Sequence, residues 1–88
     1  MKLKYTFETV DMVDEIIAVP VGDGAEKVHG VVKLDKSALE IFECLYQDTS
    51  IEMIVNYLAS KYDDTPEVLT EYVGKTIDTL RRADLIDE

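Results

Sequence analysis

The sequence predicts a single α+β domain, residues 1–88, in which a three-stranded antiparallel β-meander is followed by a unit of three helices. In the N-terminal part, apolar and polar side chains alternate or apolar side chains form β-branched runs, which is typical of strands. In the remainder, apolar side chains recur every three or four positions between recognisable helix caps. Strands joined by short links pair antiparallel, so we expect a meander.

Three stretches of the N-terminal part have strand character. We expect strands at Leu3–Val10, Glu15–Val21 and Lys27–Leu34. Alternation places Leu3, Tyr5 and Phe7 on one face of the first strand. Pro20 has no N–H to donate, so it places the end of the second strand at an edge or a turn. Gly22-Asp23-Gly24 then predicts the turn into the third strand.

Each expected helix begins at a residue suited to cap it. Asp35 precedes the first helix, and Thr49 precedes the second with Glu52 three residues later, which is the form of a capping box. Thr65 precedes the third helix with Pro66 at its first position, where a missing N–H is tolerated. The apolar positions are Ala38, Ile41, Phe42 and Leu45, then Ile51, Ile54, Val55 and Leu58, then Leu69, Tyr72, Val73, Thr76, Ile77 and Leu80.

Composition restricts the compartment and the partners. The single cysteine, Cys44, has no partner for an internal disulfide, there is no signal-peptide pattern, and no apolar stretch is long enough to span a bilayer. We therefore expect a soluble, cytoplasmic protein with no membrane partner. Nineteen acidic and nine basic residues give a net charge of −10, which repels phosphate backbones. Nucleic acid is accordingly not an expected partner.

Histidine and cysteine, the residue types most often used as nucleophiles, general bases and zinc ligands, are nearly absent. His29 is the only histidine and Cys44 the only cysteine, on a predicted strand and a predicted helix, so neither has an evident partner for nucleophilic catalysis or zinc binding. Asp63-Asp64 lacks the alternating spacing of a calcium loop, and Gly22-Asp23-Gly24 is too short for a phosphate loop. We expect no catalytic residue, no metal and no cofactor, and hence a protein that is not an enzyme.

The edge of the expected sheet is the feature that suggests binding. An unpaired strand edge presents free N–H and C=O groups, and such edges capture extended peptides as added strands. The third strand is the candidate, because Val28, Val31 and Val32 are apolar and Gly30 permits close approach of another backbone. An exposed edge also permits pairing between two copies of the chain, so a homodimer stays an open alternative.

Several segments at the right spacing resemble the PqqD family. The segment Val31–Leu45 is similar to that family's strand-to-helix region, in which an apolar strand leads into a capped helix carrying an aromatic residue. The similarity continues through Asp48–Ile54 and Leu58–Tyr62 and ends at Ala83–Ile86. Asp84 departs from the family, which usually has glycine before the final Leu-Ile pair, and this leaves the end of the third helix undefined.

The resemblance implies a winged-helix-like fold and a role as a recognition element for ribosomally made precursor peptides. The leader of the peptide would add to the third strand beside the third helix, and the complex would present it to a modifying enzyme, commonly a radical S-adenosylmethionine enzyme. Carried over to this sequence, the peptide-binding residues are Val28, His29, Gly30, Val31, Val32 and Lys33 on the strand, and Leu69, Tyr72, Thr76 and Thr79 on the helix.

Two questions stay open at this level. Lys33, Lys75 and Arg82 would suit an acidic leader, whereas the overall charge of the chain would favour a basic one. The function also has alternatives, namely an interaction subunit of another enzyme complex and a winged-helix DNA-binding protein. The DNA-binding alternative is the weaker, because the second and third helices carry as many acidic as basic side chains or more.

Overall fold

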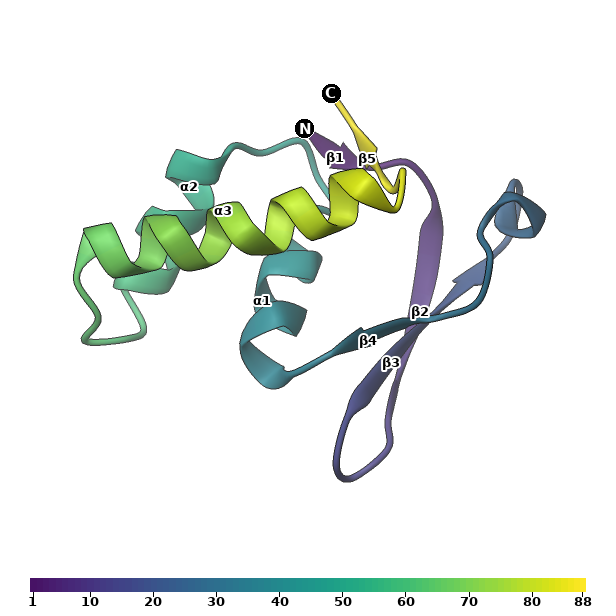
Figure 1. Cartoon of the computed structure of the whole chain (residues 1–88), viewed down its shortest axis with the longest axis horizontal. Helices are drawn as coiled ribbons and strands as arrows, with labels where there is room; N and C mark the ends of the chain where they lie inside the picture. The colour runs from purple at the N-terminus through teal and green to yellow at the C-terminus, as the bar shows by residue number, and fades with distance from the viewer.

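The computed structural model describes the whole chain, residues 1–88, as a small sheet with three helices on one side of it (Figure 1). The helices are α1 (Lys36–Cys44), α2 (Ile51–Ala59) and α3 (Pro66–Arg82). The strands are β1 (Lys2–Leu3), β2 (Thr6–Asp11), β3 (Ile16–Val21), β4 (Val32–Leu34) and β5 (Ile86–Asp87), with a short 3-10 helix, η1 (Ala25–Lys27). The predicted α+β class, a meander followed by three helices, is confirmed. None of the helices has the length and apolar character needed to cross a bilayer.

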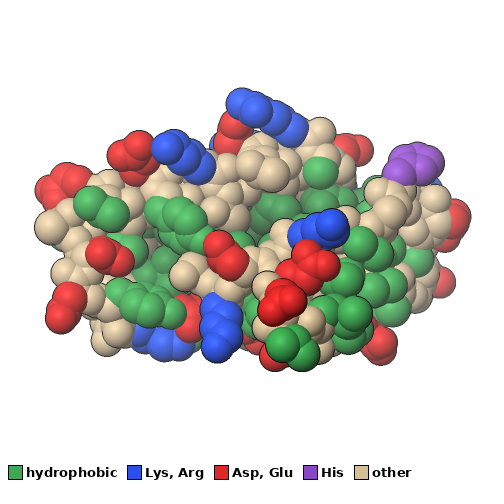
Figure 2. Space-filling model, turned by 60° about the horizontal axis from the view of Figure 1, so that its bottom comes forward, with side chains coloured by type: hydrophobic (Ala, Val, Ile, Leu, Met, Phe, Trp, Pro, Cys, Tyr) green, Lys and Arg blue, Asp and Glu red, His purple; other side chains and the backbone are tan.

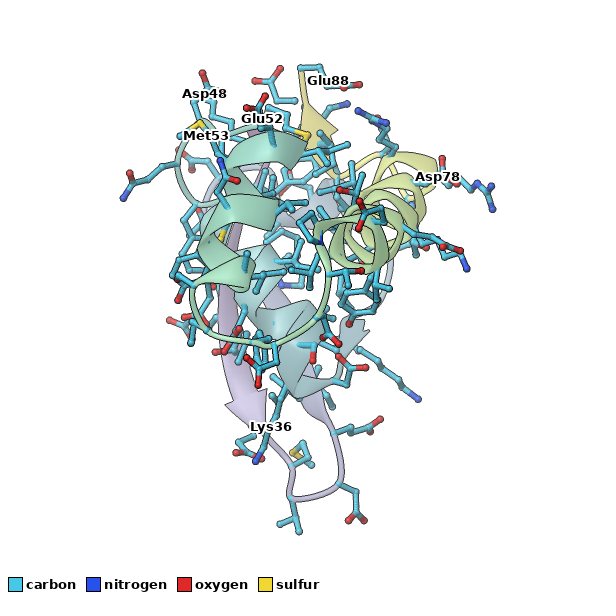
Figure 3. All side chains as sticks on the ribbon, turned by 90° about the vertical axis from the view of Figure 1, so that its left-hand side faces the viewer. Lys36, Asp48, Glu52, Met53, Asp78 and Glu88 are labelled. Atoms are coloured by element: carbon cyan, nitrogen blue, oxygen red, sulfur yellow. The ribbon has the colours of Figure 1, made fainter.

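The main sheet is an antiparallel meander in the order β2-β3-β4, so β3 is its central strand. The β2–β3 hairpin projects away from the helices in two views of the molecule (Figures 1 and 3). Pro20 lies inside β3 without breaking the sheet, because pairing with β4 extends only from Ile16 to Ala18. The missing N–H of Pro20 therefore falls beyond the last rung of that ladder.

A second, two-stranded sheet joins the two ends of the chain, and the local pattern of the sequence did not predict it. β1 pairs with β5, with Lys2 opposite Asp87 and Leu3 opposite Ile86. The expected strand Leu3–Val10 is therefore wrong as one element, since it is divided between two sheets at Lys4 and Tyr5. Pairing with a segment more than 80 residues away is a tertiary event that no local periodicity encodes.

The expected third strand is also shorter than predicted. Lys27–Leu34 was expected to be extended throughout, but only Val32–Leu34 forms β4, and Lys27 belongs to η1. Gly24 and Gly30 have φ angles of 84° and 82°, in the left-handed region that interrupts a strand. The apolar residues between these glycines have strand character in the sequence, but the turns at the two glycines keep them from joining the sheet.

The caps of α1 and α3 are those predicted. The carboxylate of Asp35 accepts a hydrogen bond from the N–H of Ala38 at 2.7 Å. The hydroxyl of Thr65 accepts one from the N–H of Val68 at 3.3 Å, with Pro66 at the first helical position. Each bond satisfies one of the N–H groups that the first turn of a helix leaves unpaired.

The predicted cap of α2 is wrong by one residue. Ser50, and not Thr49, accepts the hydrogen bond from the N–H of Met53, at 3.2 Å. The backbone of Thr49 is held by the start of the chain, because its N–H donates to the carbonyl of Met1 and its carbonyl accepts from the Met1 amino group, both at 2.8 Å. This pairing keeps Thr49 outside the helix, so the capping box with Glu52 does not form.

The core lies between the inner face of the sheet and the three helices. Phe42 on α1 is fully buried and meets Phe7 of β2 edge to face, with ring centroids 5.1 Å apart. The predicted inward positions supply most of this core. Its largest fully buried side chains are Phe42, Ile41, Leu45, Ile54, Leu58, Ile77 and Val73.

Helix α3 ends in a regular C-terminal cap, although Asp84 stands where the PqqD family usually has glycine. The N–H of Leu85 donates to the carbonyl of Leu80 at 3.0 Å, and the N–H of Asp84 donates to the carbonyl of Arg81 at 2.9 Å. These two bonds form a Schellman motif, in which the residue after the cap is left-handed. Asp84 occupies that position with φ of 60°, and aspartate tolerates it better than most side chains.

Candidate functional site

The main sheet has two free edges, β2 and β4, and they differ in their surroundings. β4 is the edge that leads directly into α1, and it pairs on one side only, with Ala18 opposite Val32 and Ile16 opposite Leu34. β2 is the longer edge, and its side chains other than Phe7 are exposed. An edge that borders other elements of the fold offers a docking peptide side-chain contacts as well as backbone groups.

The hydrogen-bond phase of the sheet identifies the backbone groups that face away from it. The N–H of Met12 donates to the carbonyl of Glu15 at 2.7 Å, which makes these two residues a hydrogen-bonded pair at the start of the β2–β3 ladder. Such pairs alternate with non-bonded ones along an antiparallel ladder, so Ile17 directs its backbone groups to β2. Lys33 lies opposite Ile17 and therefore directs its own N–H and C=O outward, to the free edge.

The three residues before β4 leave even more of the backbone unpaired. His29, Gly30 and Val31 make no backbone hydrogen bond, and their side chains make none. Val28, the residue before them, is still bound within the 3-10 turn, because its N–H donates to the carbonyl of Ala25 at 3.1 Å. The backbone groups of His29, Gly30 and Val31, together with the outward groups of Lys33, are consequently free donors and acceptors that a second extended chain can satisfy.

A groove runs beside this segment. It has a volume of about 520 Å³ and is bounded by the Lys27–Val32 segment on one side and by the end of α3 on the other. Tyr5, between β1 and β2, joins the two sides. The residues that line the groove are Tyr5, Lys27, Val28, His29, Val31, Val32, Ala83, Asp84 and Leu85.

The strand residues predicted from the sequence are gathered at this groove. Val28, His29, Val31 and Val32 line it, whereas Gly30 and Lys33 lie on the same segment without lining it. Figure 2 shows the lone histidine, His29, standing at the upper right of one face, with hydrophobic side chains below it. The strand half of the predicted site is therefore contiguous in space.

The helix residues predicted from the sequence lie farther along α3 and have other contacts. Leu69 is 4% exposed and belongs to the core. The hydroxyl of Tyr72 donates to the carboxylate of Asp35 at 3.3 Å. Thr76 donates to the carbonyl of Tyr72 at 3.1 Å, and Thr79 donates to the carbonyl of Lys75 at 3.0 Å, both within the helix. None of these four residues lines the groove.

Five lining residues were not among the predicted ones, namely Lys27, which precedes the predicted segment, and four residues from the two ends of the chain. Tyr5, Ala83, Asp84 and Leu85 reach the groove because β1 pairs with β5 and brings the two ends of the chain beside η1 and β4. The carboxylate of Asp84 forms an ion pair with Lys4, and the hydrogen bond that Lys4 donates to it is the main reason why the pKa of Lys4 is raised. No local signal in the sequence marks these residues, since their proximity depends on tertiary pairing.

The remaining chemistry of the chain is sparse. No group of three or more His, Cys, Asp or Glu side chains is placed to hold a metal ion. Cys44 is half-buried on α1, and burial raises the pKa of its thiol, which disfavours the nucleophilic thiolate. A second hollow of about 450 Å³ lies around Lys2–Phe7, where the N–H groups of Leu3 and Lys4 are already bound to the carbonyls of Leu45 and Leu85.

Comparison with known proteins places this geometry in context. Residues 11–86 match the sequence profile of a family described as "Coenzyme PQQ synthesis protein D (PqqD)". Among solved structures, the fold is similar to the one titled "TbiB1 in Complex with the TbiA(beta) Leader Peptide". That similarity has a TM-score of 0.73 at 17% sequence identity and covers 99% of this chain and 95% of the other. A search of curated protein sequences finds no significant match.

Proposed function

Since this chain belongs to the PqqD family, we propose that it binds the leader of a ribosomally made precursor peptide and presents it to a modifying enzyme. The leader adds as a strand to the edge formed by His29–Lys33, and the groove beside that edge receives its side chains. The partner enzyme is of the radical S-adenosylmethionine class or another peptide-modifying class. The chain itself contributes recognition and no bond-making step.

The run of unpaired backbone groups from His29 to Val31, continued by the outward groups of Lys33, is the observation that carries this proposal. A peptide that pairs with it gains backbone hydrogen bonds without displacing any existing one. The adjacent groove adds apolar contact, since Val28, Val32 and Leu85 line it. Because a flexible peptide has to be ordered as it docks, we expect a dissociation constant on the order of micromolar.

The similar solved structure supports the proposal from a second direction. Its title describes TbiB1 in complex with a leader peptide, and nearly the whole of both chains superposes.

The test is binding of a fluorescein-labelled leader peptide, taken from a precursor gene beside the gene of this chain, measured by fluorescence anisotropy. Val31→Pro removes a free N–H at the β4 edge, whereas Val31→Ala shortens the same side chain but keeps that N–H. Thr9→Pro is the matched control, because Thr9 pairs with Ala18 at a non-bonded position and so directs its N–H to the opposite edge of the sheet. Circular dichroism checks that each variant is folded.

We expect Val31→Pro to abolish saturable binding, while Val31→Ala and Thr9→Pro retain it within about threefold. Loss of binding in Thr9→Pro alone would move the site to the β2 edge. Equal affinity in all three variants would rule out strand addition at either edge. Duplex DNA serves as a second ligand, and saturable binding to DNA without binding to the leader would support the DNA-binding alternative instead.

A further inference from the structure

The basic residues of this acidic protein are mostly neutralised by acidic partners. Five of the nine lysines and arginines are in ion pairs, namely Lys4 with Asp84, Lys61 with Glu40, Lys75 with Glu71, Arg81 with Glu88 and Arg82 with Asp78. Four have no acidic group within 4.0 Å, and these are Lys2, Lys27, Lys33 and Lys36.

Three of the four unpaired lysines lie within ten residues of one another, around the free edge. Lys27 and His29 line the groove, and Lys33 lies on β4 itself. Lys36, which Figure 3 labels near the turn of the β2–β3 hairpin, differs, because it shares a hollow there with Asp11, Asp14 and Glu15, whose carboxylates offset its charge. We refer to Lys27 and Lys33 as the basic pair of the site.

No free carboxylate among the groove-lining residues compensates the charges of this basic pair. Asp84 is the only acidic residue among those that line it, and Lys4 already neutralises Asp84. Asp23 and Glu26, which are close in sequence, do not line the groove. The site is thus locally positive, although the chain carries a net charge of −10.

A bound peptide experiences mainly the local positive charge of the site and not the net negative charge of the chain, because electrostatic interactions in salt solution are short-ranged. Two unit charges 4 Å apart near a protein surface interact by roughly 1–4 kcal/mol, depending on the local dielectric. At physiological ionic strength the screening length is about 8 Å, so carboxylates on the far side of a domain contribute little at the site. The nearby lysines therefore outweigh the net charge of the molecule once the peptide is in contact.

We propose that the leader bound by this chain is acidic, with Asp or Glu side chains at the positions that lie beside Lys27 and Lys33. The proposal rests on the proposed function and specifies the class of peptide. In an added strand, side chains alternate between the two faces of the sheet. Val32 is partly buried on the inner face and Lys33 is exposed on the outer face. The leader segment accordingly alternates residues directed to the groove, which are apolar except beside Lys27, with acidic residues beside Lys33.

The test uses two forms of the labelled leader, the natural sequence and one in which every Asp and Glu is replaced by Asn or Gln. Each is titrated with the natural protein, with Lys33→Glu, and with Lys2→Glu. Lys2→Glu is the matched control, since Lys2 is also unpaired but lies in β1, outside the groove. The two variants have the same net charge, so any difference between them reports local contact and not overall repulsion.

We expect Lys33→Glu to weaken binding of the natural leader at least tenfold and Lys2→Glu to change it less than threefold. The neutralised leader should bind the natural protein more weakly, with a smaller dependence on salt. A leader with Lys at its acidic positions should regain affinity for Lys33→Glu. Equal affinities for Lys33→Glu and Lys2→Glu, or equal affinities for the two leaders, would overturn the acidic-leader proposal.

The outcomes also separate this proposal from the proposed function. Binding that is lost in Val31→Pro but unaffected by the charge changes would retain strand addition and reject the acidic leader. Absence of binding by either leader to the natural protein would reject both. A leader that has no carboxylate in the bound segment and still binds with full affinity would reject the acidic-leader proposal alone.

Discussion

The hydroxyl of Tyr72 on α3 donates to the carboxylate of Asp35, 3.3 Å away, and the same carboxylate caps α1. Asp35 is also the residue that follows β4, so one side chain joins the end of the edge strand, the start of α1 and the middle of α3. The distance between the candidate binding edge and the long helix is therefore set in part by this contact.

We expect Tyr72→Phe to lower the free energy of unfolding at pH 7 by about 0.5–1.5 kcal/mol, because the hydrogen bond to Asp35 is lost while the ring is kept. Burial, followed by the charge of Asp35, raises the pKa of Tyr72 in the folded protein above its usual value of 10.0. A raised folded pKa gives stability that is present below pH 10 and lost as the pH rises above it. In urea denaturation at pH 7, 9 and 11, the free energy of unfolding should therefore fall less steeply with rising pH in Tyr72→Phe than in the natural protein.

Tyr5→Phe is the control for that measurement, since the hydroxyl of Tyr5 makes no hydrogen bond with the protein. It should leave the free energy of unfolding at pH 7 nearly unchanged. An alkaline decline of the same steepness in Tyr72→Phe and in the natural protein would contradict the assigned coupling between Tyr72 and Asp35.

The cap of α2 can be tested with two adjacent substitutions. Ser50→Ala removes the hydroxyl that accepts from the N–H of Met53, and we expect it to cost about 1 kcal/mol. Thr49→Ala should cost clearly less, because Thr49 contributes its backbone groups to Met1 and no side-chain hydrogen bond. Thermal or chemical denaturation of both variants gives the comparison, and a larger loss in Thr49→Ala would restore the capping box predicted from the sequence.

Asp84 should be replaceable with a gain in stability. A left-handed conformation costs most residues roughly 1–2 kcal/mol and glycine nearly nothing, so Asp84→Gly is expected to stabilise the protein by about 0.5–1 kcal/mol. Asp84→Asn keeps a side chain that tolerates this conformation and removes only the exposed ion pair with Lys4. The free energies of unfolding of the two variants, measured at equilibrium, separate the effect of the backbone conformation at residue 84 from the effect of the ion pair with Lys4. A destabilised Asp84→Gly with an unchanged Asp84→Asn would contradict the backbone explanation.

Glu40 should contribute to stability in acid. The hydrogen bond from Lys61, together with that from the hydroxyl of Tyr62, lowers the pKa of Glu40 below its usual value of 4.5. A lowered folded pKa gives stability that is present above pH 4.5 and lost as the pH falls below it. We expect Glu40→Gln to flatten the acid decline of stability between pH 5 and 3.

Glu43→Gln provides the control on the same helix, because Glu43 is exposed and forms no ion pair. Denaturation midpoints at pH 3, 4, 5 and 7 would be compared among the two variants and the natural protein. If Glu43→Gln flattened the loss of stability in acid, or if Glu40→Gln left it unchanged, the contact between Glu40 and Lys61 would not be the cause of that loss.

The helices illustrate how far local sequence reaches. Asp35 and the Thr65-Pro66 pair start α1 and α3 where predicted, because a cap acts within three residues of itself. The apolar stripe that contains Ile41, Phe42 and Ile77 is buried as expected, because helical periodicity fixes which side chains share a face. Thr49 was misassigned because its backbone is held by the N-terminus, which a local pattern does not reveal.

The candidate site shows the same division. The residues from Val28 to Lys33 were identifiable as an edge segment from their apolar character and from Gly30, but the turn conformations at Gly24 and Gly30 reduced the strand to its last three residues. The other side of the groove was not identifiable. It consists of Tyr5 and the Ala83–Leu85 segment, which no local periodicity connects.

By itself the sequence determined the α+β class, the order of strands and helices, two of the three helix caps and the apolar residues of the core, since all of these depend on interactions within a few residues or on hydrophobic pattern. Only the tertiary structure decided the pairing of β1 with β5, the groove that this pairing closes and the distribution of ion pairs that leaves Lys27 and Lys33 free. These features depend on which distant segments meet, and that is settled when the chain packs as a whole.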